Sequence, residues 1–457
     1  MQFEKKNVLV VGSGKSGVAA VKLLLKAGAN PCLQDGNKEL TEDKLKEKLG
    51  EVSVSEGQSL SFVIGELSQQ QKEALDYVVL SPGVPTDNAF VNDLRSFGLP
   101  ILGEIELAYL FEKGDVLAIT GTNGKTTTTT LLGEIMKRHV QKTFVVGNIG
   151  NPYTDEVQKT DETSVTVAEI SSFQLETVHT FAPAVTAILN VTPDHLDRHH
   201  TMENYVAAKE AIAGNQTKEQ FCVLNYEDAY ARAFADRCNA TPIFFASAHE
   251  LADGFYYKEE CIYKAVGGSA EKLMNIHEMR LLGIHNVENV MAAIAMADAY
   301  HVPMDTILDT VRTFRAVEHR IEYVATKNGV DYYNDSKGTN PDAAIKAITA
   351  MVKPTYLIGG GYDKQSAYDE WIESFEGKVI TLVLLGQTAK AIAECAKKHG
   401  FENYVFAESL QEAVDYCSNH AKEGEAVLLS PACASWGMFP NYEVRGNMFK
   451  DMVHALK

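Results

Sequence analysis

The residues with the clearest chemical potential form a glycine-rich loop, residues 121–127 (GTNGKTT), between an apolar stretch and an amphipathic one. Its two glycines let backbone amides face a phosphate, Lys125 can reach the outer phosphates of a nucleotide, and Thr126 can hold Mg²⁺. The spacing departs from the strict GxxxxGK(S/T) pattern, because Ile119 stands where the first glycine belongs. A strand before the loop and a helix after it still predict a phosphate-binding site. The alternative is a glycine-rich loop with a solvated lysine.

Two polar residues follow later apolar stretches that we expect to be strands of the same sheet. Glu169 lies in "VAEISSFQLE" and His195 in "NVTPDHLDRH". Ligands of doubly wound sheets bind at the carboxyl ends of the strands, so both side chains would lie at the edge that carries the phosphate loop. A single histidine is more often a surface or capping residue, but an acid and a histidine at this edge favour magnesium ligation. Lys209 in "NYVAAKEAI", taken alone, is expected to be a solvated helical lysine.

A second glycine pattern, residues 12–17 (GSGKSG), lies between an apolar strand and a helix, and Asp35 closes the next expected strand. This is the dinucleotide fingerprint, which suggests NAD. Because amides at a helix N-terminus bind any diphosphate, another nucleotide fits as well. The third interpretation is a tight strand-to-helix turn without a cofactor, since glycine is needed there for steric reasons.

Three polar loops follow apolar stretches in the C-terminal third: "NDSKGTNPDA", "GGGYDK" and "SPACASWGMFPNYEVRG". As single residues, Arg320, Asp335 and Lys337 are ordinary. The first loop is informative as a unit, because a polar loop that runs into the start of a helix makes an anion site.

The bulk composition limits the class of protein. A chain of 457 residues predicts two or three domains. The net charge of −19 argues against general nucleic-acid binding. The seven cysteines include no CxxC pair, which suits a reducing cytosol better than a disulfide framework or a zinc site. Without a signal-peptide layout or a run long enough to span a bilayer, we expect a soluble cytoplasmic protein with no membrane partner.

Strands and helices alternate in three successive α/β blocks, which predict parallel sheets with helices on both faces. The expected domains are residues 1–103, 104–316 and 317–457. Two antiparallel hairpins are expected, in "GFYYKEECIYKAV" and in "IEYVATKNGVDYYND".

Together these motifs resemble the Mur ligases along essentially the whole chain. The resemblance rests on "GTNGKTT", "EISSFQLE", "NVTPDHLDRH", "AAKEAI", "GIHNVENVMAA", "EHRIE", "DSKGTNPDA" and "SPACASWGMFPNYEVRG", which occur in the family's order. It implies an N-terminal Rossmann-like domain that holds UDP, a central P-loop-type domain with a doubly wound, mostly parallel sheet that holds ATP, and a C-terminal Rossmann-like α/β domain that holds the amino acid. "DSKGTN" with "SPACAS" is similar to the branch of the family that adds D-glutamate.

The resemblance also implies roles for individual residues. The implied UDP-substrate site consists of Lys15, Ser16, Asp35, Gly36, Asn37, Gly83 and Asn148. The implied ATP site consists of Gly121, Thr122, Asn123, Gly124, Lys125, Thr126, Thr127, Asn286, Asn289, Arg320 and Asp335. Thr126, Glu169, His195 and a carbamylated Lys209 would surround two Mg²⁺ ions, and Lys125, His195 and Lys209 would be the catalytic residues. The D-glutamate pocket would use Lys337, Thr339, Lys364, Ser435, Trp436 and Tyr442.

The implied reaction joins D-glutamate to UDP-N-acetylmuramoyl-L-alanine with ATP, through an acyl phosphate, in a cytoplasmic monomer. Two positions depart from the family: Gly437 stands where relatives often have Asp, and Tyr442 where some have Phe. Both fall in the amino-acid pocket. The alternatives are folylpolyglutamate synthase, which lacks an N-terminal block of this kind, a dehydrogenase or NAD-responsive regulator with an attached ATPase, and a motor or switch NTPase.

Overall fold

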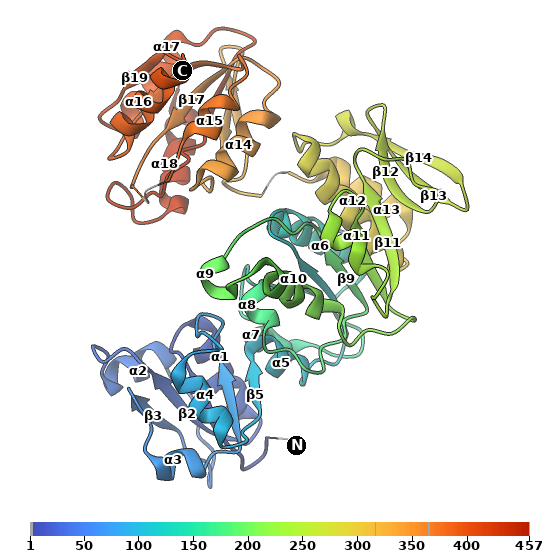
Figure 1. Ribbon diagram of the computed structural model, residues 1–457, viewed down its shortest axis with the longest axis vertical. Helices are drawn as coiled ribbons and strands as arrows, with labels where there is room; N and C mark the ends of the chain where they lie inside the picture. Colours follow the sequence, from blue (N-terminus) through green and yellow to red (C-terminus); the bar gives the residue numbers. More distant parts are fainter. Residues whose placement is uncertain (1–2, 316, 364–365, 457) are drawn as a thin grey trace. The chain divides into compact units, whose positions relative to one another are not determined.

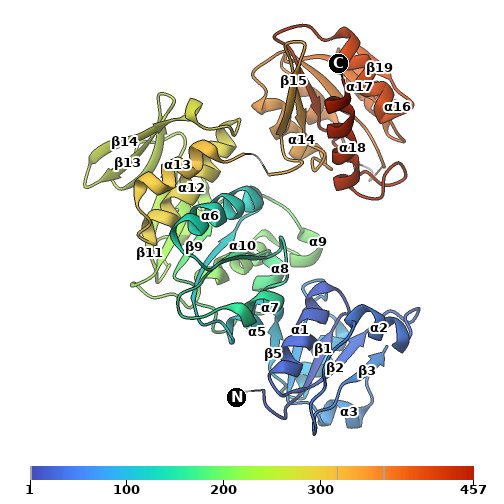
Figure 2. The same ribbon diagram turned by 180° about the vertical axis from the view of Figure 1, so that it is seen from behind.

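The computed structural model describes residues 3–315, 317–363 and 366–456, so that Lys364 lies outside the described residues. The chain forms two compact units. The first comprises Met1–Ile276 and Glu288–Val311, and the second comprises His277–Val287 and Arg312–Lys457. Figures 1 and 2 show three separate sheets, two in the first unit and one in the second. No helix in the described part of the chain is both long and apolar enough to cross a membrane.

The first sheet has the order β3-β2-β1-β4-β5, and all its strands are parallel. Its strands are β1 (Asn7–Val11), β2 (Asn30–Asp35), β3 (Ser61–Ile64), β4 (Tyr77–Leu80) and β5 (Ile101–Gly103). Its helices are α1 (Lys15–Lys26), α2 (Glu42–Leu49), α3 (Gln69–Glu73) and α4 (Ala89–Ser96). A Cβ on Gly17 would lie 1.9 Å from the Gly12 carbonyl oxygen, so glycine is required where α1 leaves β1. The strand order reverses between β1 and β4, which brings their following loops together.

The second sheet has nine strands in the order β14-β13-β12-β11-β10-β9-β6-β8-β7. They are β6 (Asp115–Thr120), β7 (Thr143–Gly147), β8 (Val165–Glu169), β9 (Val185–Ile188), β10 (Phe221–Asn225), β11 (Thr241–Ala246), β12 (Gly254–Lys258), β13 (Cys261–Val266) and β14 (Ser269–Asn275). The strands from β7 to β12 are parallel, whereas β12, β13 and β14 pair antiparallel. The first predicted hairpin is therefore confirmed as β12 and β13.

The helical elements from Glu104 to Thr313 lie before, between and after the strands of this sheet in the chain. They are α5 (Glu104–Tyr109), α6 (Lys125–His139), α7 (Tyr153–Glu156), η1 (Val157–Lys159), α8 (Ser172–Leu175), α9 (Leu196–His199), α10 (Met202–Glu210), η2 (Ala211–Ala213), α11 (Ala229–Phe234), η3 (Ile276–Glu278), α12 (Ile284–Ala299) and α13 (Met304–Thr313).

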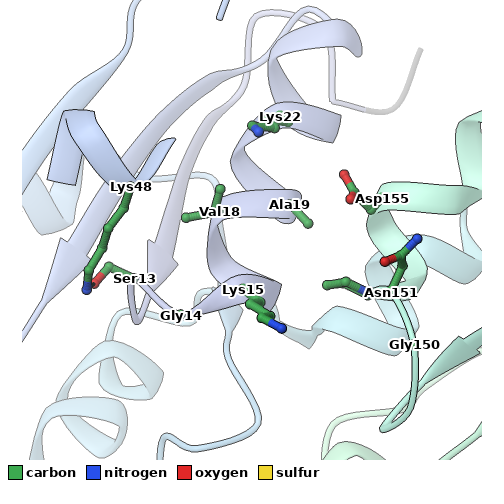
Figure 3. Close-up of a pocket in the computed structure, with 11 residues that line it drawn as sticks. Ser13, Gly14, Lys15, Val18, Ala19, Lys22, Lys48, Gly150, Asn151 and Asp155 are labelled. Carbon is green, nitrogen blue, oxygen red and sulfur yellow. Dashed lines mark hydrogen bonds between the residues drawn. The ribbon is translucent and has the colours of Figure 1, made fainter. Parts of the chain in front are cut away.

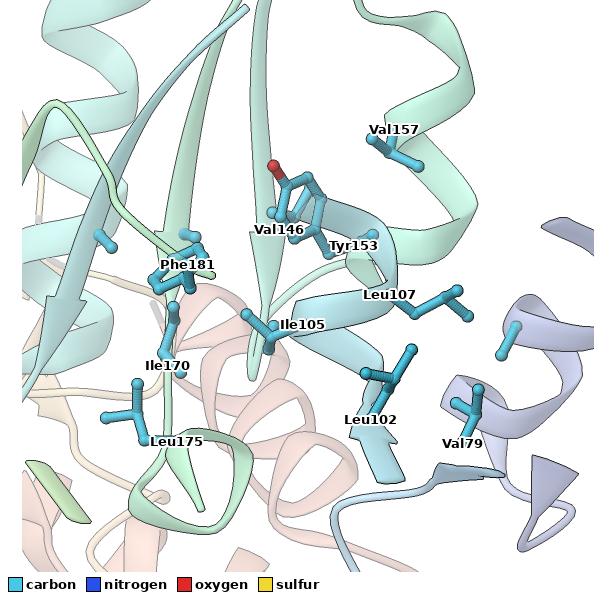
Figure 4. Packing of buried hydrophobic residues seen from close by; sticks show 14 of the residues in the cluster. Val79, Leu102, Ile105, Leu107, Val146, Tyr153, Val157, Ile170, Leu175 and Phe181 are labelled. Carbon is cyan, nitrogen blue, oxygen red and sulfur yellow. The ribbon is translucent and has the colours of Figure 1, made fainter. Parts of the chain in front are cut away.

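One hydrophobic core cluster joins the first two sheets. Figure 4 shows Val79 and Leu102 of the first sheet near Ile105 and Leu107 of α5, with Tyr153 of α7 in the same cluster. All five are at most 7 % exposed, so the first two predicted domains share a buried apolar interface. The first boundary, between residues 103 and 104, falls inside this unit, between β5 and α5. The bounds of the three predicted domains stay predictions.

The third sheet, in the second unit, has the order β15-β16-β20-β17-β18-β19. Its strands are β15 (Glu322–Lys327), β16 (Val330–Asn334), β17 (Thr355–Gly359), β18 (Val379–Leu384), β19 (Tyr404–Phe406) and β20 (Ala426–Leu429). Its helices are α14 (Pro341–Ala350), α15 (Asp369–Glu373), α16 (Ala389–Lys398), α17 (Leu410–His420) and α18 (Tyr442–Ala455). Only β15 runs antiparallel, which confirms the second predicted hairpin, β15 with β16.

Candidate active site

The glycine-rich loop, Glu169 and the segment that holds His195 all leave the same edge of the second sheet. Strand β6 lies between β8 and β9, with Ile119 opposite Glu169 and Thr120 opposite Ile188. The chain continues from β6 to β7 and β8 on one side and then crosses to β9 on the other. This is a topological switch point, where open α/β sheets bind ligands at the carboxyl ends of their strands.

The glycine-rich loop has the backbone that a phosphate-binding loop requires. Gly121 and Gly124 have φ angles of 156° and 86°, and a Cβ on Gly124 would lie 2.1 Å from Asn289 Oδ1. Helix α6 begins at Lys125, so the amides of its first turn face the loop. Lys125 Nζ donates to the carbonyl oxygens of Gly121, at 2.8 Å, and Thr122, at 3.0 Å. Ile119 still belongs to the strand ladder and is fully buried, so the strand extends through the position of the missing glycine.

Glu169 offers a buried acceptor at this edge. Its side chain is 1 % exposed, and its Oε1 accepts a hydrogen bond from Asn148 Nδ2 at 2.9 Å. Its Oε2 is buried without a hydrogen-bond partner among the described residues. A buried carboxylate oxygen in that condition costs free energy unless a cation or a donor satisfies it. Mg²⁺ prefers oxygen ligands, and Glu169, at the end of β8, and Thr126, the second residue of α6, offer a carboxylate and a hydroxyl oxygen.

His195 lies at the same edge but is more exposed. It has a left-handed backbone, with φ 52°, and directly precedes α9. Its side chain is 50 % exposed, its Nε2 lies 3.4 Å from Asp194 Oδ2, and its ring centroid lies 4.9 Å from that of Phe173. The imidazole is therefore accessible to a ligand.

Lys209 on α10 is not a solvated lysine. It is 1 % exposed, and its Nζ lies 4.6 Å from the centre of the Tyr205 ring. Burial, and then the positive charge of Lys125, lower the pKa of Lys209 well below its usual value, although the charge of Asp194 opposes the shift. The expectation of a solvated lysine is therefore wrong, because tertiary packing buries the side chain. Burial in turn disfavours the ammonium form. Tyr205 also connects α10 to the loop, because its hydroxyl lies 3.0 Å from Thr122 Oγ1.

A cavity of about 650 Å³ lies between the loops that follow β1, β4 and β7. Five of the residues assigned to the UDP-substrate site line it: Lys15, Ser16, Asp35, Gly83 and Asn148. Burial alone would raise the pKa of Asp35, but hydrogen bonds from Ser13 and Asn37 hold it below its usual value. Asp35 is therefore a charged acceptor at the end of β2. Gly36 and Asn37 follow it directly in the chain but do not line this cavity.

An adjoining cavity of about 480 Å³ adds two cations that the sequence motifs did not indicate, Lys22 and Lys48 (Figure 3). Lys15 lines this cavity as well, and Lys48 Nζ donates to Ser13 Oγ at 2.9 Å. Figure 3 shows Asn151 and Asp155 on the wall opposite α1. Lys48 lies on α2, outside any motif, so only the folded structure indicates that it lies beside the glycine turn.

Asn148 connects the cavity to the phosphate-loop edge. It lines the cavity and donates to Glu169 Oε1. A Cβ on the neighbouring Gly147 would lie 2.2 Å from the Glu169 carbonyl oxygen, so the close approach of these two segments requires glycine. A ligand in the cavity would thus contact Asn148, and Asn148 is hydrogen-bonded to Glu169, the carboxylate that would hold a cation.

Arg198, in the motif that carries His195, holds this motif against the loop after β4. It donates to Glu176 through Nε at 3.2 Å and through Nη2 at 2.7 Å, and Nη2 also donates to the Val84 carbonyl oxygen at 3.0 Å. Thr86 Oγ1 donates to the same carboxylate at 3.0 Å. The sequence analysis missed this role, because Glu176, Val84 and Arg198 lie far apart in the chain.

We expect Arg198→Met to lower the free energy of unfolding by roughly 2 kcal/mol, because it leaves the Glu176 carboxylate without its cation in a mostly buried place. The two side chains are 11 % and 14 % exposed. Urea denaturation measures the effect. Lys46→Met, which breaks an exposed pair with Glu42, is the matched control and should change stability by less than about 0.5 kcal/mol. Equal losses in the two variants would contradict a stabilising role for Arg198.

The remaining residues assigned to ATP are divided between the two units. Asn289 belongs to the first, whereas Asn286, Arg320 and Asp335 belong to the second. Asp335 accepts from Ser430 Oγ at 2.7 Å, and burial raises its pKa to about 7 even though Ser430 and the charge of Arg320 oppose the shift. Arg320 Nε is buried without a hydrogen-bond partner in the described part of the chain.

The loops assigned to D-glutamate converge in the second unit through Arg445, which the sequence analysis did not single out. Arg445 is 2 % exposed and donates to Ser336 and to the Cys433 carbonyl oxygen, so it holds two of these loops together.

The residues predicted to bind D-glutamate differ in their exposure and contacts. Lys337 Nζ lies 5.4 Å from the centre of the Tyr442 ring. Ser435 is buried and Trp436 is exposed. Thr339 immediately precedes the Asn340 cap of α14.

Gly437 has a φ angle of 83°, so the departure from Asp at this position has a backbone reason. Glycine adopts this left-handed conformation freely, and Asp and Asn are the side-chain residues that tolerate it best. Nothing in the described structure lies close to the position of a Gly437 Cβ except the edge of the Tyr362 ring, at 4.0 Å.

Comparison with known proteins gives a family for each part of the chain. Residues 6–103 match the "Mur ligase MurD-like, N-terminal domain", residues 119–297 the "Mur ligase middle domain" and residues 319–433 the "Mur ligase, glutamate ligase domain". The chain is 56% identical over 456 residues to a UDP-N-acetylmuramoylalanine–D-glutamate ligase of Lachnospira eligens, with 100% of both chains covered. It is 45% identical over 459 residues to a protein of the same name from Clostridioides difficile, again with 100% of both covered.

Solved structures show the same fold at lower identity. A UDP-N-acetylmuramate-alanine ligase from Thermotoga maritima matches with a TM-score of 0.60 and 20% identity, covering 98% of this chain and 99% of that one. A MurF structure from Acinetobacter baumannii matches with a TM-score of 0.62 and 14% identity, covering 98% and 93%.

Proposed function

Because this chain belongs to the Mur ligase family, we propose that it joins D-glutamate to UDP-N-acetylmuramoyl-L-alanine and converts ATP to ADP and phosphate, a step of peptidoglycan precursor synthesis. The relatives that share the whole length of the chain carry the name of this ligase. The observation that carries the proposal is the Asn148–Glu169 hydrogen bond between a nucleotide-sized cavity and the edge with the phosphate loop. The cavity and the phosphate loop therefore adjoin, so that the acyl end of a UDP-linked substrate would lie near the γ-phosphate of ATP.

The reaction requires two transfers. An oxygen of the L-alanine carboxylate attacks the γ-phosphorus, the bond to the β–γ bridging oxygen breaks, and ADP leaves. The neutral amine of D-glutamate then attacks the acyl carbon, phosphate leaves, and the amine loses a proton to form the amide. Lys125 and the first-turn amides of α6 offset the charge of the transferring group. An acyl phosphate hydrolyses in water, so water must be excluded from the site during catalysis.

Family membership implies ATP and Mg²⁺, and the donor set at the phosphate-loop edge fits the metal. Thr126, Glu169 and His195, with a carbamylated Lys209, would hold two ions. Mg²⁺ supplies charge compensation to the phosphates and keeps them in position for in-line attack. Glu169 contributes the buried carboxylate, and Asn148 fixes the orientation of that carboxylate. The half-exposed His195 would orient ligands near the metal at the carboxyl ends of the strands.

The assay that tests this proposal measures phosphate release from ATP in the presence of UDP-N-acetylmuramoyl-L-alanine, with and without D-glutamate. Release that requires both substrates, together with formation of the amide product, is the expected result. Release that is indifferent to the amine acceptor, with retention of NAD by the purified protein, would instead indicate a dehydrogenase or regulator with an attached ATPase. The monomeric state and the cytoplasmic location stay predictions.

The second unit would bind D-glutamate through cations and hydroxyls, since both carboxylates of the amino acid are negative while its amine must be neutral. We assign Lys364 and Ser435 to the side-chain carboxylate, and Lys337 with Thr339 to nearby polar contacts. Trp436 and Tyr442 would wall the pocket. Lys364 follows the loop 360–363, which pairs with the "SPACAS" loop through a bridge between Tyr362 and Ala434.

Lys364→Ala should raise the KM for D-glutamate by the equivalent of roughly 2–4 kcal/mol, because a carboxylate loses a charge-assisted hydrogen bond in a partly desolvated site. The KM for the UDP-linked substrate should change little. Steady-state kinetics with each substrate varied in turn measures both. Lys390→Ala, at an exposed position of the same unit, is the control. An equal rise in both KM values would mean that the unit acts only as a lid.

A further inference from the structure

A group of metal-ligating side chains lies in the second unit on two helices that contact each other, α15 and α16 (Figure 1). Asp369 begins α15, Cys395 lies on α16, and His399 follows the last residue of α16. The ligand atoms of these three side chains all lie within 4.8 Å of one another. In the part of the chain that the structure describes, this is the one group of three or more such side chains.

The spacing of the residues explains why they converge. Cys395 and His399 are four residues apart, so they project from the same face of α16. Asp369 and Glu373 have the same spacing on α15. The sequence analysis expected no zinc site because the cysteines form no CxxC pair. A Cys-x₃-His pair on a helix nevertheless presents two ligands to one metal, as an i, i+4 histidine pair does.

The orientation of His399 fits a metal ligand. Its Nε2 lies 2.8 Å from Asp369 Oδ1, on the side of the cluster, while its Nδ1 lies 3.2 Å from Glu373 Oε1. A metal-bound histidine generally donates its other ring N–H to a carboxylate, which fixes the tautomer and the orientation of the ring. Glu373 would accept that hydrogen bond and leave Nε2 for the metal.

We propose that Cys395, His399 and Asp369 bind a thiophilic divalent cation, for which Zn²⁺ is the best chemical match, with water as the fourth ligand. Sulfur, imidazole and carboxylate are the donors of tetrahedral zinc sites, whereas Mg²⁺ prefers oxygen ligands alone. On binding, the Cys395 thiol gives its proton to the solvent and the thiolate coordinates the metal. The metal would join α15 to α16 and stabilise the second unit.

One nearby cation opposes the metal. Lys398 Nζ donates to Asp369 Oδ1 at 2.6 Å, so a metal at this carboxylate must displace the ammonium group. Removing the lysine should therefore strengthen metal binding. A cluster that is only a surface ion-pair network gives no such increase.

The test is a titration of the reduced full-length protein with Co²⁺, in the presence of excess Mg²⁺. Wild type should show a near-ultraviolet thiolate-to-cobalt charge-transfer band and tetrahedral visible bands, which Zn²⁺ removes. Thr126, Glu169 and His195 contain no sulfur, so cobalt at the phosphate-loop edge cannot produce the charge-transfer band. Cys395→Ser and His399→Gln should abolish it, and Cys32→Ser, at a half-buried cysteine of β2, should retain it. Lys398→Met should raise the affinity roughly two- to fivefold.

Thermal melts supply an independent readout. Zn²⁺ should raise the Tm of wild type and Cys32→Ser but not that of Cys395→Ser, with near-ultraviolet circular dichroism to establish that each variant is folded. The absence of the band in wild type would overturn the proposal. So would a band of equal strength in Cys395→Ser, or weaker binding by Lys398→Met.

Discussion

Lys125→Ala should lose most of the ligase turnover, with kcat lower by about 10³-fold, because it removes a cation directed at charge that develops on the transferring phosphoryl group. The lysine is the first residue of α6 and its ammonium already lies over the loop, bonded to two loop carbonyl oxygens. Alanine favours the helix as well as lysine does, so the fold should survive. Initial rates of ADP formation at saturating substrates measure the effect.

The matched control for this variant is Lys137→Ala, near the other end of the same helix. Lys137 is half exposed and pairs with Glu134 one turn earlier. Its loss should leave kcat within about twofold of wild type, since a solvated ion pair contributes little. Near-normal activity of Lys125→Ala, with an intact circular dichroism spectrum, would mean that the glycine-rich loop is not the catalytic phosphate site.

Local patterns in the sequence predict much of the fold. Apolar runs predicted the strands β1, β6, β8 and β20, and the structure buries these strands almost completely. Both hairpins follow from alternating segments around a turn. The association of the first two sheets in one unit was not predictable in this way. It depends on a core cluster that includes Val79, Leu102 and Tyr153, and residue periodicity does not indicate which distant element a buried face contacts.

The candidate site likewise has features that the sequence predicts and features that it does not. Glu169 and His195 could be placed at one edge because each follows a strand and parallel strands end at a common edge. The hydrogen bonds from Asn148 to Glu169 and from Arg198 to Glu176 could not be predicted, because tertiary packing brings together side chains about 20 residues apart. The burial of Lys209 was missed for a related reason. A lysine on a helix usually extends to solvent, and only the tertiary structure buries this one, with its Nζ over the Tyr205 ring.

Lys209→Arg should fail as completely as Lys209→Ala, although arginine keeps the positive charge and much of the length. A carbamate forms when a neutral amine attacks CO₂ and releases one proton, and the buried Lys209 is held toward the neutral form by burial and by the charge of Lys125. The product is an anion that can orient a metal ion. A guanidinium remains protonated, forms no carbamate and would introduce an uncompensated charge next to Lys125.

Three measurements decide between this role and a structural lysine. Wild-type activity should fall when dissolved CO₂ is removed and return when bicarbonate is added, whereas neither treatment should change the residual activity of Lys209→Arg or Lys209→Ala. Lys218→Arg, at an exposed position a few residues later, should behave as wild type throughout. Mass spectrometry after chemical trapping of carbamates should detect the modification at Lys209 and not at Lys218. An active Lys209→Arg variant, or a wild type that is indifferent to bicarbonate, would show that the amine itself, rather than its carbamate, is the functional group that α10 presents to the phosphate loop.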